Sequence, residues 1–451
     1  MPIVDIIAAI ATPTGRGGIG VVRVSGEDLK PLSLAILGSV PKDRYATLCS
    51  FRDGDGLIID NGIALFFPGP HSYTGEDVLE LQGHGGPEIM KLLLSRCLAA
   101  GARLAQPGEF TLRAFLNNKM DLAQAEAVSD LIDASSSEAV RYAVRSLQGD
   151  FSAAILKLVS SVINLRMTIE AILDFPEEET GLLYQSGLFT ALNDIGAQLE
   201  CVLTSAKQGN LLREGRRVVL VGRPNVGKSS LINRLAGEEV SIVTEIPGTT
   251  RDAIRQEISL EGVSLQFIDT AGLRETHDPV EKIGIAHTRA AIENADLALL
   301  LIDARSGVTP GDRTILDAFP PGLPVIQVFN KIDILNEYPR ISFSSDVQEV
   351  YLSAKTGAGI ELLRQVMLEV FGWRPSISGE GLFMARQRHL QALSEARAHF
   401  QAAAAMVGCE LQLELLAEEL RLAQHSLSSI TGEFAADALL GEIFSRFCIG
   451  K

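Results

Sequence analysis

The feature that most constrains the fold is a glycine-rich loop between an apolar run and a helical segment. The apolar, valine-rich run 218–222 ends at Gly222, and Gly227-Lys228-Ser229 follows after four residues. This is the G-x-x-x-x-G-K-[ST] spacing, with a strand predicted before it and a helix, 231–236, after it. Backbone N–H groups of such a loop point at phosphate oxygens, the lysine reaches the outer phosphates, and the serine hydroxyl coordinates Mg²⁺. The alternative, a glycine-rich turn that binds nothing, fits the full spacing poorly.

The surrounding region has the pattern of an α/β domain. Strands and helices alternate from residue 216 to about 373, which is typical of a mostly parallel sheet covered on both faces. The predicted strand 263–268 ends in Asp269-Thr270-Ala271-Gly272. An aspartate there can orient Mg²⁺ through its water shell, and Gly272 can offer its N–H to a γ-phosphate.

A further motif selects the base. The buried strand expected at 323–329 ends in Asn330-Lys331-Ile-Asp333, and Ser353-Ala354-Lys355 follows the next strand. The Asp333 carboxylate can accept hydrogen bonds from both N1–H and N2–H₂ of guanine, and adenine offers no such pair of donors. Together with the phosphate loop, these motifs predict a GTPase, with its site at the strand ends of an open sheet.

Between the two phosphate motifs lies a candidate switch loop, Thr244-Glu245-Ile246-Pro247-Gly248-Thr249-Thr250. Thr250 or Thr249 is the natural Mg²⁺ ligand, and the Pro-Gly turn suits a loop that orders when nucleotide binds. The position after Gly272 holds Leu273, where Ras-like enzymes place a water-orienting glutamine. Hydrolysis is therefore either very slow or assisted by another group, and the nearest candidates are Arg274, Glu275 and Glu281.

The first hundred residues predict a small α+β domain. Strands are expected at 6–11 and 20–25, with further short strands at 58–59, 62–67 and 78–82 and a helix at 87–100. Residues 15–20 match G-x-G-x-x-G, but a strand follows where a dinucleotide site needs a helix, so we interpret them as a hairpin loop. By spacing alone, Arg23 and Glu80 are ordinary surface charges.

Amphipathic helical patterns occur on both sides of the central domain. They cover 120–133, 135–147, 151–173 and 187–208 before it, and 382–407, 410–427 and 434–447 after it. Each block has an apolar face to bury. We favour one helical domain split by the inserted nucleotide domain over two separate bundles.

Composition limits the possible classes of protein. The chain has 451 residues, more than one compact core accommodates, and its net charge of −16 argues against generic adhesion to nucleic acid or anionic membrane, although a local basic patch could still bind RNA. No apolar run is long enough for a bilayer span, and the five scattered cysteines favour a reducing cytoplasm over a disulfide framework. We expect a cytoplasmic protein without membrane or DNA partners.

These motifs, taken with their flanks, resemble those of one family. The four G-domain motifs are similar to those of the translation-factor-related bacterial GTPases. Residues 11–20, 72–77 and 108–113 and the terminal Phe447-Cys448-Ile449-Gly450-Lys451 resemble the MnmE (TrmE) family of tRNA-modification GTPases over the whole chain. The terminal residues are the most specific mark; the alternatives are a frayed tail or a prenylation box, which Gly450 and Lys451 fit poorly.

The resemblance implies an organisation and a reaction. It implies an N-terminal dimerisation and tetrahydrofolate-binding α+β domain (1–118), a helical domain in two parts (119–214 and 375–451) and an inserted Ras-like G domain (215–374). It implies a homodimer that forms a heterotetramer with an FAD-dependent partner, MnmG. Together they would add an aminomethyl or carboxymethylaminomethyl group to C5 of the wobble uridine of certain tRNAs. The one-carbon donor would be 5-formyl- or 5,10-methylene-tetrahydrofolate.

The resemblance also assigns roles to residues. Arg23, Glu80, Lys119 and Lys451 would bind the folate, with Cys448 close to it. K⁺ would be held by Asn225, Thr244, Ile246 and Thr249, and Mg²⁺ by Ser229 and Thr250. Glu281 would orient the attacking water, so our catalytic candidates are Glu281, Lys228 and Cys448. The other expected nucleotide contacts are Val226, Gly227, Ser230, Glu245, Pro247, Gly248, Asp269, Thr270, Ala271, Gly272, Asn330, Lys331, Asp333, Ser353, Ala354 and Lys355.

A K⁺ ion would stand where other GTPases receive an arginine finger, because a fixed cation offsets the charge that develops between the phosphates. The competing hypothesis is a ribosome-assembly or RNA-binding switch GTPase without one-carbon chemistry. Such proteins usually carry an added basic RNA-binding module, and none is visible in this sequence.

Overall fold

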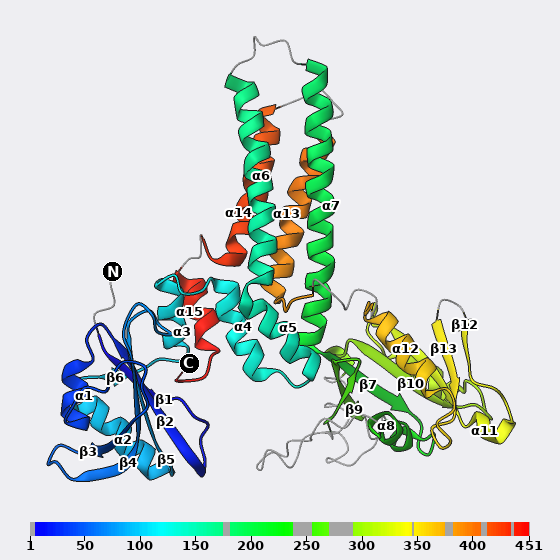
Figure 1. Ribbon diagram of the computed structural model, residues 1–451. Coiled ribbons are helices and arrows are strands. Elements are labelled where there is room, and N and C mark those ends of the chain that lie inside the picture. The colour runs from blue at the N-terminus through cyan, green and yellow to red at the C-terminus, as the bar shows by residue number, and fades with distance from the viewer. Residues whose placement is uncertain are drawn as a thin grey trace. The chain divides into compact units, whose positions relative to one another are not determined.

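The computed structural model describes residues 5–174, 181–237, 255–269, 292–344, 347–374, 382–406, 413–433 and 437–450. The chain divides into two compact units. One comprises Met1–Ser129, Ile155–Ile163 and Arg421–Lys451, and the other comprises Asp130–Ala154 and Asn164–Leu420. Figure 1 labels the elements, and each unit is described by itself below.

The first unit contains a six-stranded sheet in the order β3-β4-β5-β2-β1-β6. All neighbouring strands are antiparallel except β1 and β6, which are parallel. The strands are β1 (Ile7–Ile10), β2 (Gly17–Gly26), β3 (Thr47–Arg52), β4 (Ile58–Phe67), β5 (Asp77–Gly85) and β6 (Arg103–Leu104). The helices of this domain are α1 (Lys30–Leu37), α2 (Pro87–Ala99) and α3 (Glu109–Leu116).

The two faces of this sheet bury different residues, as the alternation of side chains along a strand requires. Val22 and Val24 of β2 belong to the apolar core formed with α1 and α2. Ile7 and Ala9 of β1 instead pack with Phe110 of α3. Since Arg23 lies between Val22 and Val24, its side chain is directed to the α3 face.

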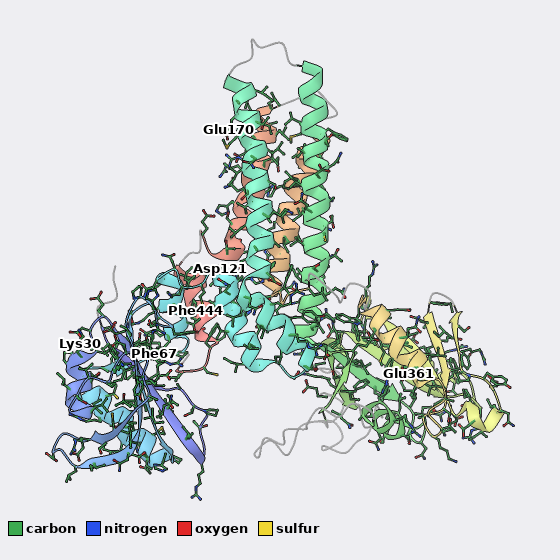
Figure 2. All side chains as sticks on the ribbon, in the orientation of Figure 1. Lys30, Phe67, Asp121, Glu170, Glu361 and Phe444 are labelled. Atoms are coloured by element: carbon green, nitrogen blue, oxygen red, sulfur yellow. The ribbon has the colours of Figure 1, made fainter. Side chains whose placement is uncertain are left out.

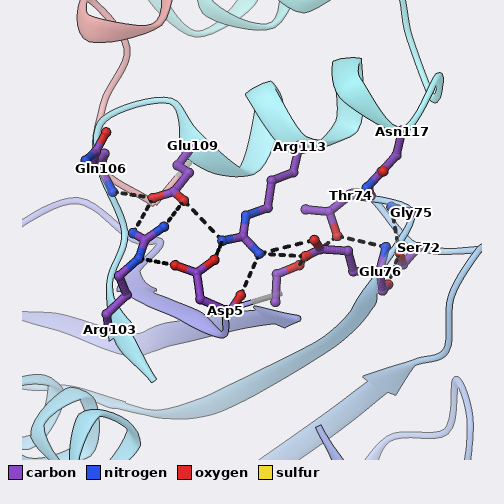
Figure 3. Close-up of polar contacts among 11 residues, drawn as sticks. Asp5, Ser72, Thr74, Gly75, Glu76, Arg103, Gln106, Glu109, Arg113 and Asn117 are labelled. Carbon is purple, nitrogen blue, oxygen red and sulfur yellow. Dashed lines mark hydrogen bonds and ion pairs between the residues drawn. The ribbon is translucent and has the colours of Figure 1, made fainter. Parts of the chain in front are cut away.

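A buried ionic network joins α3 to this sheet (Figure 3). The Arg113 side chain is only 1% exposed and contacts the carboxylates of Asp5, Glu76 and Glu109 at 2.8, 3.0 and 3.1 Å. Arg103 forms further ion pairs with Asp5 and Glu109. The network fixes α3 and the 72–77 loop against the start of β1, because Arg113, Glu76 and Glu109 are buried charges that need these partners.

Long helices occupy the sequence on both sides of the central domain. Before it are α4 (Leu122–Asp133), α5 (Ser137–Gln148), α6 (Asp150–Asp174) and α7 (Gly181–Glu214), and after it are α13 (Gln387–Met406), α14 (Leu413–Thr431) and α15 (Asp437–Ser445). Helix α7 packs along α13, as Figure 1 shows, so helices from both blocks share a core. The two blocks also meet in the first unit, where Phe444 of α15, labelled in Figure 2, is buried with Leu122 of α4. Within each unit, helices from before and after the central domain pack together, as the expectation of a split helical domain requires.

Helix α6 is one described helix that meets the length and composition of a membrane span. An 18-residue window within 150–173 has a mean hydropathy of 1.3. The sequence-based expectation concerned uninterrupted apolar runs, and α6 is not one, since Lys157, Asn164 and Arg166 interrupt it. Its buried residues, among them Ile155, Val162 and Ile169, recur at helical spacing and alternate with polar ones such as Lys157, which is the pattern of a helix packed in a soluble core.

The second unit contains a seven-stranded sheet in the order β12-β13-β11-β10-β7-β9-β8. The central strands are parallel, and β12 and β8 run antiparallel at the two edges. The strands are β7 (Arg216–Gly222), β8 (Arg255–Leu260), β9 (Val263–Asp269), β10 (Leu297–Asp303), β11 (Val325–Asn330), β12 (Arg340–Ser344) and β13 (Val347–Leu352). The helices that the structure describes here are α8 (Lys228–Ala236), α10 (Pro310–Asp317), α11 (Ile332–Leu335) and α12 (Ile360–Val370). The predicted open α/β domain is confirmed.

Local differences from the sequence-based expectation have physical causes. Residues 58–67 form the single strand β4, not two short strands. Residues 382–386, expected at the start of a helix, are not helical. The Met384 N–H donates to the Ser146 hydroxyl at 2.8 Å, and Leu382 and Met384 are buried. This backbone therefore hydrogen-bonds to another segment instead of forming a helical turn.

Candidate functional site

The phosphate loop has the backbone conformation that its sequence predicts. Gly227 precedes α8 with a φ of 103°, and a Cβ atom there would lie 2.4 Å from the Asn330 amide nitrogen. Only glycine fits this position without displacing Asn330. The Lys228 ammonium donates to the Gly222 carbonyl at 2.7 Å, and Ser229 and Ser230 are exposed in the first turn of α8. The loop therefore directs a lysine and two hydroxyls to the N-terminus of a helix, which favours anions.

Asn330 connects the phosphate loop to the base-binding loops. The residue is 3% exposed, and its side-chain amide nitrogen donates to the Val226 carbonyl at 2.8 Å. Its side-chain oxygen accepts from the N–H groups of Lys331 and Ala354 at 2.8 and 2.9 Å. One amide thus holds three segments far apart in sequence in a fixed geometry.

Asp333 and Ser353 form a second link between these loops. The Ser353 hydroxyl donates to the Asp333 carboxylate at 2.6 Å. The Lys355 carbonyl accepts from the Arg234 guanidinium of α8 at 2.6 Å. The carboxylate that would read guanine is therefore oriented before a nucleotide arrives.

Lys331 lies between the phosphate loop and the end of β10. Its ammonium donates to the Asn225 carbonyl at 2.7 Å and to the Asp303 carboxylate at 2.8 Å. Sequence reasoning identified Lys331 and missed Asp303. One signal could have identified Asp303: it is an acidic residue at the end of β10, and β10 is the parallel neighbour of β11, which carries Asn330.

Several predicted site residues lie outside the described part of the chain. These are Thr244, Glu245, Ile246, Pro247, Gly248, Thr249, Thr250, Thr270, Ala271, Gly272, Glu281 and Lys451. Asp269 ends β9 and pairs in register with Leu220 of β7. The strand order thus brings the Asp269 backbone beside the strand that leads into the phosphate loop.

Arg23 and Glu80 are neighbours on the α3 face of the first unit's sheet. They are cross-strand partners in β2 and β5, and the guanidinium donates to the Glu80 carboxylate at 2.9 and 3.1 Å. Both side chains are half-buried, which corrects the surface placement favoured by spacing alone. Their opposite charges are therefore held together on the α3 face of the sheet, partly shielded from solvent.

Aromatic side chains lie beneath this pair and were not singled out from sequence. The Arg23 guanidinium lies 5.5 Å from the Tyr73 ring centroid and 5.9 Å from that of Phe110. Burial raises the pKa of Tyr73, although its hydrogen bond to Thr111 and the charge of Arg23 act in the opposite direction. The phenol is therefore neutral at physiological pH, and Arg23 makes cation–π contacts with two uncharged rings.

The remaining described folate candidates lie in the same unit. The Lys119 ammonium donates to the Pro70 carbonyl at 3.0 Å, at the start of the loop that carries Tyr73. The C-terminal segment lies against the end of β1, where a Cβ atom on Gly450 would be 2.4 Å from the Ile10 carbonyl oxygen. Cys448 has an exposed free thiol, and its backbone carbonyl accepts a hydrogen bond from the Gly108 N–H at 3.4 Å. Lys119 and Cys448 thus contact segments that border the Arg23–Glu80 pair, and neither makes a described contact with that pair.

Comparison with known proteins matches the whole chain. Residues 6–119 match the family described as GTP-binding protein TrmE N-terminus, and residues 122–448 match the MnmE helical domain. The tRNA modification GTPases MnmE of Nitrosospira multiformis and Nitrosomonas europaea are each 62% identical to this chain, over 99% of both chains. That of Thiobacillus denitrificans is 58% identical over 99% of this chain and 98% of its own.

The chain belongs to the MnmE family. Membership accounts for the order of its parts, an α+β domain, a helical domain and an inserted GTPase domain, which the resemblance implied. The relatives' name, tRNA modification GTPase, agrees with the GTPase motifs of the central domain.

Proposed function

We propose that this chain is a K⁺-dependent GTP hydrolase that modifies tRNA together with an FAD-dependent partner, MnmG. The pair adds a carboxymethylaminomethyl or aminomethyl group to C5 of the wobble uridine, with a tetrahydrofolate as the one-carbon donor. Membership of the MnmE family makes GTP hydrolysis in tRNA modification the coarse activity. The observation that carries the finer proposal is a preformed guanine-type site in the same chain as the half-buried Arg23–Glu80 pair.

The described G-domain residues support GTP as the nucleotide. Asn330 holds the phosphate loop to the base loops, and Ser353 orients the Asp333 carboxylate at 2.6 Å. In this proposal Asp333 accepts from the two guanine donors and Lys228 neutralises charge on the outer phosphates. Glu281, outside the described residues, orients the attacking water in place of the glutamine that Leu273 replaces.

The residues present fit the expected metal ions. The exposed Ser229 hydroxyl follows Lys228 in the first turn of α8, and hydroxyl oxygens suit Mg²⁺. Asn225 is exposed in the phosphate loop, and its side chain carries an amide oxygen of the kind that binds K⁺. We propose Ser229 with Thr250 for Mg²⁺, and Asn225 with Thr244, Ile246 and Thr249 for K⁺. The two cations would offset negative charge on the phosphates during hydrolysis.

The first unit fits a reduced folate. A pterin presents adjacent N–H donors that a carboxylate can bind in pairs, and Glu80 is held for that purpose by Arg23. The Lys119 ammonium suits the carboxylates of the glutamate tail. Gly450, which has no Cβ to meet the Ile10 carbonyl, lets the C-terminal segment lie against the end of β1. We propose that Cys448 and Lys451 also contribute to the folate site. The folate would supply the one-carbon unit.

We further propose a homodimer formed through the N-terminal domain, a heterotetramer with MnmG, and a cytoplasmic location. The proposed domain boundaries remain 1–118, 119–214, 215–374 and 375–451. Packing of α7 on α13 supports the joining of the second and fourth ranges into one domain.

Two measurements on the purified full-length chain test this proposal. Replacement of K⁺ by Na⁺ should strongly lower GTP hydrolysis, whereas equal rates in both salts would contradict the cation role. Glu281→Ala should lower turnover with nearly unchanged GTP affinity, and a collapse of affinity would instead indicate a structural role.

Equilibrium dialysis with 5-formyl-tetrahydrofolate tests the folate site. Glu80→Gln removes the carboxylate's charge with little change of shape and should weaken binding, and Glu88→Gln on the exposed part of α2 is the matched control. An absence of folate binding by the unaltered chain would contradict the one-carbon chemistry.

A further inference from the structure

The Asp303 carboxylate belongs to no nucleotide motif, yet it is bonded to a residue that does. The Lys331 ammonium bridges the Asn225 carbonyl at 2.7 Å and the Asp303 carboxylate at 2.8 Å. Lys331 itself has a φ of 74°, a backbone conformation that turns its side chain back across the end of the sheet. Its position therefore depends on two partners, one in the phosphate loop and one at the end of β10.

Sheet register brings Asp303 to this position. Asp303 is the last residue of β10 and pairs in parallel register with Asn330, the last residue of β11. The Ala304 N–H donates to the Asn330 carbonyl at 2.8 Å, which continues the ladder past both strands. The two strands thus fix the distance between Asp303 and the residue that follows Asn330.

A neighbouring arginine holds the Asp303 carboxylate in one orientation. Arg305 donates to its two oxygens through Nε at 3.0 Å and Nη2 at 2.6 Å. The Asp303 side chain is 14% exposed and that of Arg305 is 51% exposed. The hydrogen bond from Arg305 has the largest effect and lowers the pKa of Asp303. Burial acts in the opposite direction, but the hydrogen bond from Lys331 lowers the pKa further, so it lies well below its usual range. The group is therefore an anion throughout the physiological range.

We propose that Asp303 is a positioning residue for guanine nucleotides, which fixes the Lys331 side chain along the base before the nucleotide binds. A lysine has many rotamers, and their loss opposes binding unless another interaction has already selected one. Asp303 supplies that interaction without touching the nucleotide. The inference rests on the proposed placement of guanine at Asn330 and Asp333. Because Lys331 is proposed to lie along the base, which GTP and GDP share, the effect of Asp303 on the two should be equal.

A purely structural role for Asp303 makes a different prediction. Its carboxylate also accepts from the Arg305 N–H at 3.1 Å, which closes the turn after β10. Asp303→Asn keeps an oxygen for this turn but loses the charge that binds Lys331. Lys331→Asn removes the ammonium, and asparagine tolerates the left-handed backbone found there.

The test is a double-mutant cycle on the full chain, read as dissociation constants for GDP and a non-hydrolysable GTP analogue. Asp303→Asn should weaken both by about tenfold, the loss expected for one charge-assisted hydrogen bond, and should add almost nothing in the Lys331→Asn background. Arg305→Ala, at an exposed site that should not impair folding, should give a smaller loss that also disappears in that background. Asp317→Asn, exposed at the end of α10, is the charge-matched control and should change neither constant.

Two results would overturn the proposal. Equal losses from Asp303→Asn with and without Lys331 would indicate a structural role, and no loss in the unaltered background would indicate no role. If Lys331→Asn and Asp333→Asn weaken binding while Asp303→Asn does not, this inference alone fails. If none of the three has an effect, the base is not bound at this motif and the proposed function fails with it.

Discussion

The side-chain amide of Asn330 donates a hydrogen bond of 2.8 Å to the carbonyl of Val226, which joins the end of β11 to the phosphate loop. The same side chain accepts from Ala354, so the loops for phosphate and for base form one unit. A change in either loop is therefore expected to alter the other. This link explains why guanine recognition and phosphate binding cannot be treated as separate properties of the G domain.

Replacement of Asn330 should affect both folding and binding. Asn330→Ala leaves the Val226 carbonyl and the Ala354 N–H buried without this partner, at a cost of about 1–3 kcal/mol for each group. GTP and GDP affinity should fall together, measured by titration calorimetry, and the thermal transition should move to lower temperature. Asn233→Ala, exposed on α8, is the control, and equal effects of the two substitutions would contradict this role.

Asp333→Asn should change which nucleotide is bound. An asparagine offers one donor and one acceptor where the carboxylate offers only acceptors, which suits xanthine better than guanine. Its oxygen can still accept from the Ser353 hydroxyl, so the loop should remain in place. The ratio of kcat/KM for xanthosine and guanosine triphosphates should rise by orders of magnitude, and an unchanged ratio would place the base elsewhere.

Arg113→Ala should strongly destabilise the N-terminal domain. The substitution leaves the buried Glu76 without its cation and Glu109 with Arg103 alone, and breaking a buried pair costs about 3–5 kcal/mol. Hydrogen exchange of the α3 amides in the full chain reads this local stability. Arg446→Ala removes an exposed pair with Glu442 and should cost at most about 1 kcal/mol. Similar losses of α3 protection from both substitutions would show that burial is not decisive.

The same network should make α3 sensitive to acid. Burial alone raises the pKa of Glu109, but hydrogen bonds from Arg103, the Gln106 N–H and Arg113 outweigh it, so the pKa lies below its ordinary value. A carboxyl group with a lowered folded pKa contributes stability above its unfolded pKa of about 4.3, and this stability is lost as pH falls through the folded pKa. Protection factors of the α3 amides should therefore be constant from pH 7 to about 5 and decrease below pH 4. An increase over that acidic range would contradict the assignment.

The sequence alone was sufficient where chemistry follows local spacing. The phosphate loop, the Asn330 motif and the alternating pattern of the G domain each depend on neighbouring residues, and the strand and helix around Gly227 were predicted correctly. The Arg23–Glu80 pair and the Lys331–Asp303 pair could not be predicted in this way. Each depends on the register between strands, and that register joins residues 57 and 28 positions apart.

Helix boundaries show the same limit. The predicted helix 187–208 is the middle of α7, Gly181–Glu214. Residues 208–212 are buried on every side, so the one-sided apolar periodicity that marks a helix is lost there. Helix α3 was not predicted at all. Its charged residues Glu109 and Arg113 are buried, and they satisfy each other and Arg103 in a way that hydrophobic periodicity does not detect.

The central claim is that the GTP site of this chain serves modification of the wobble uridine. Mass spectrometry of wobble uridines tests it most directly, in a strain that lacks the gene and carries either the unaltered chain or its Asp333→Asn form. The account predicts that the deletion removes the carboxymethylaminomethyl and aminomethyl groups, that the unaltered chain restores them, and that Asp333→Asn restores little because cells supply GTP. Full modification in the deletion strain, or full restoration by Asp333→Asn, would contradict it.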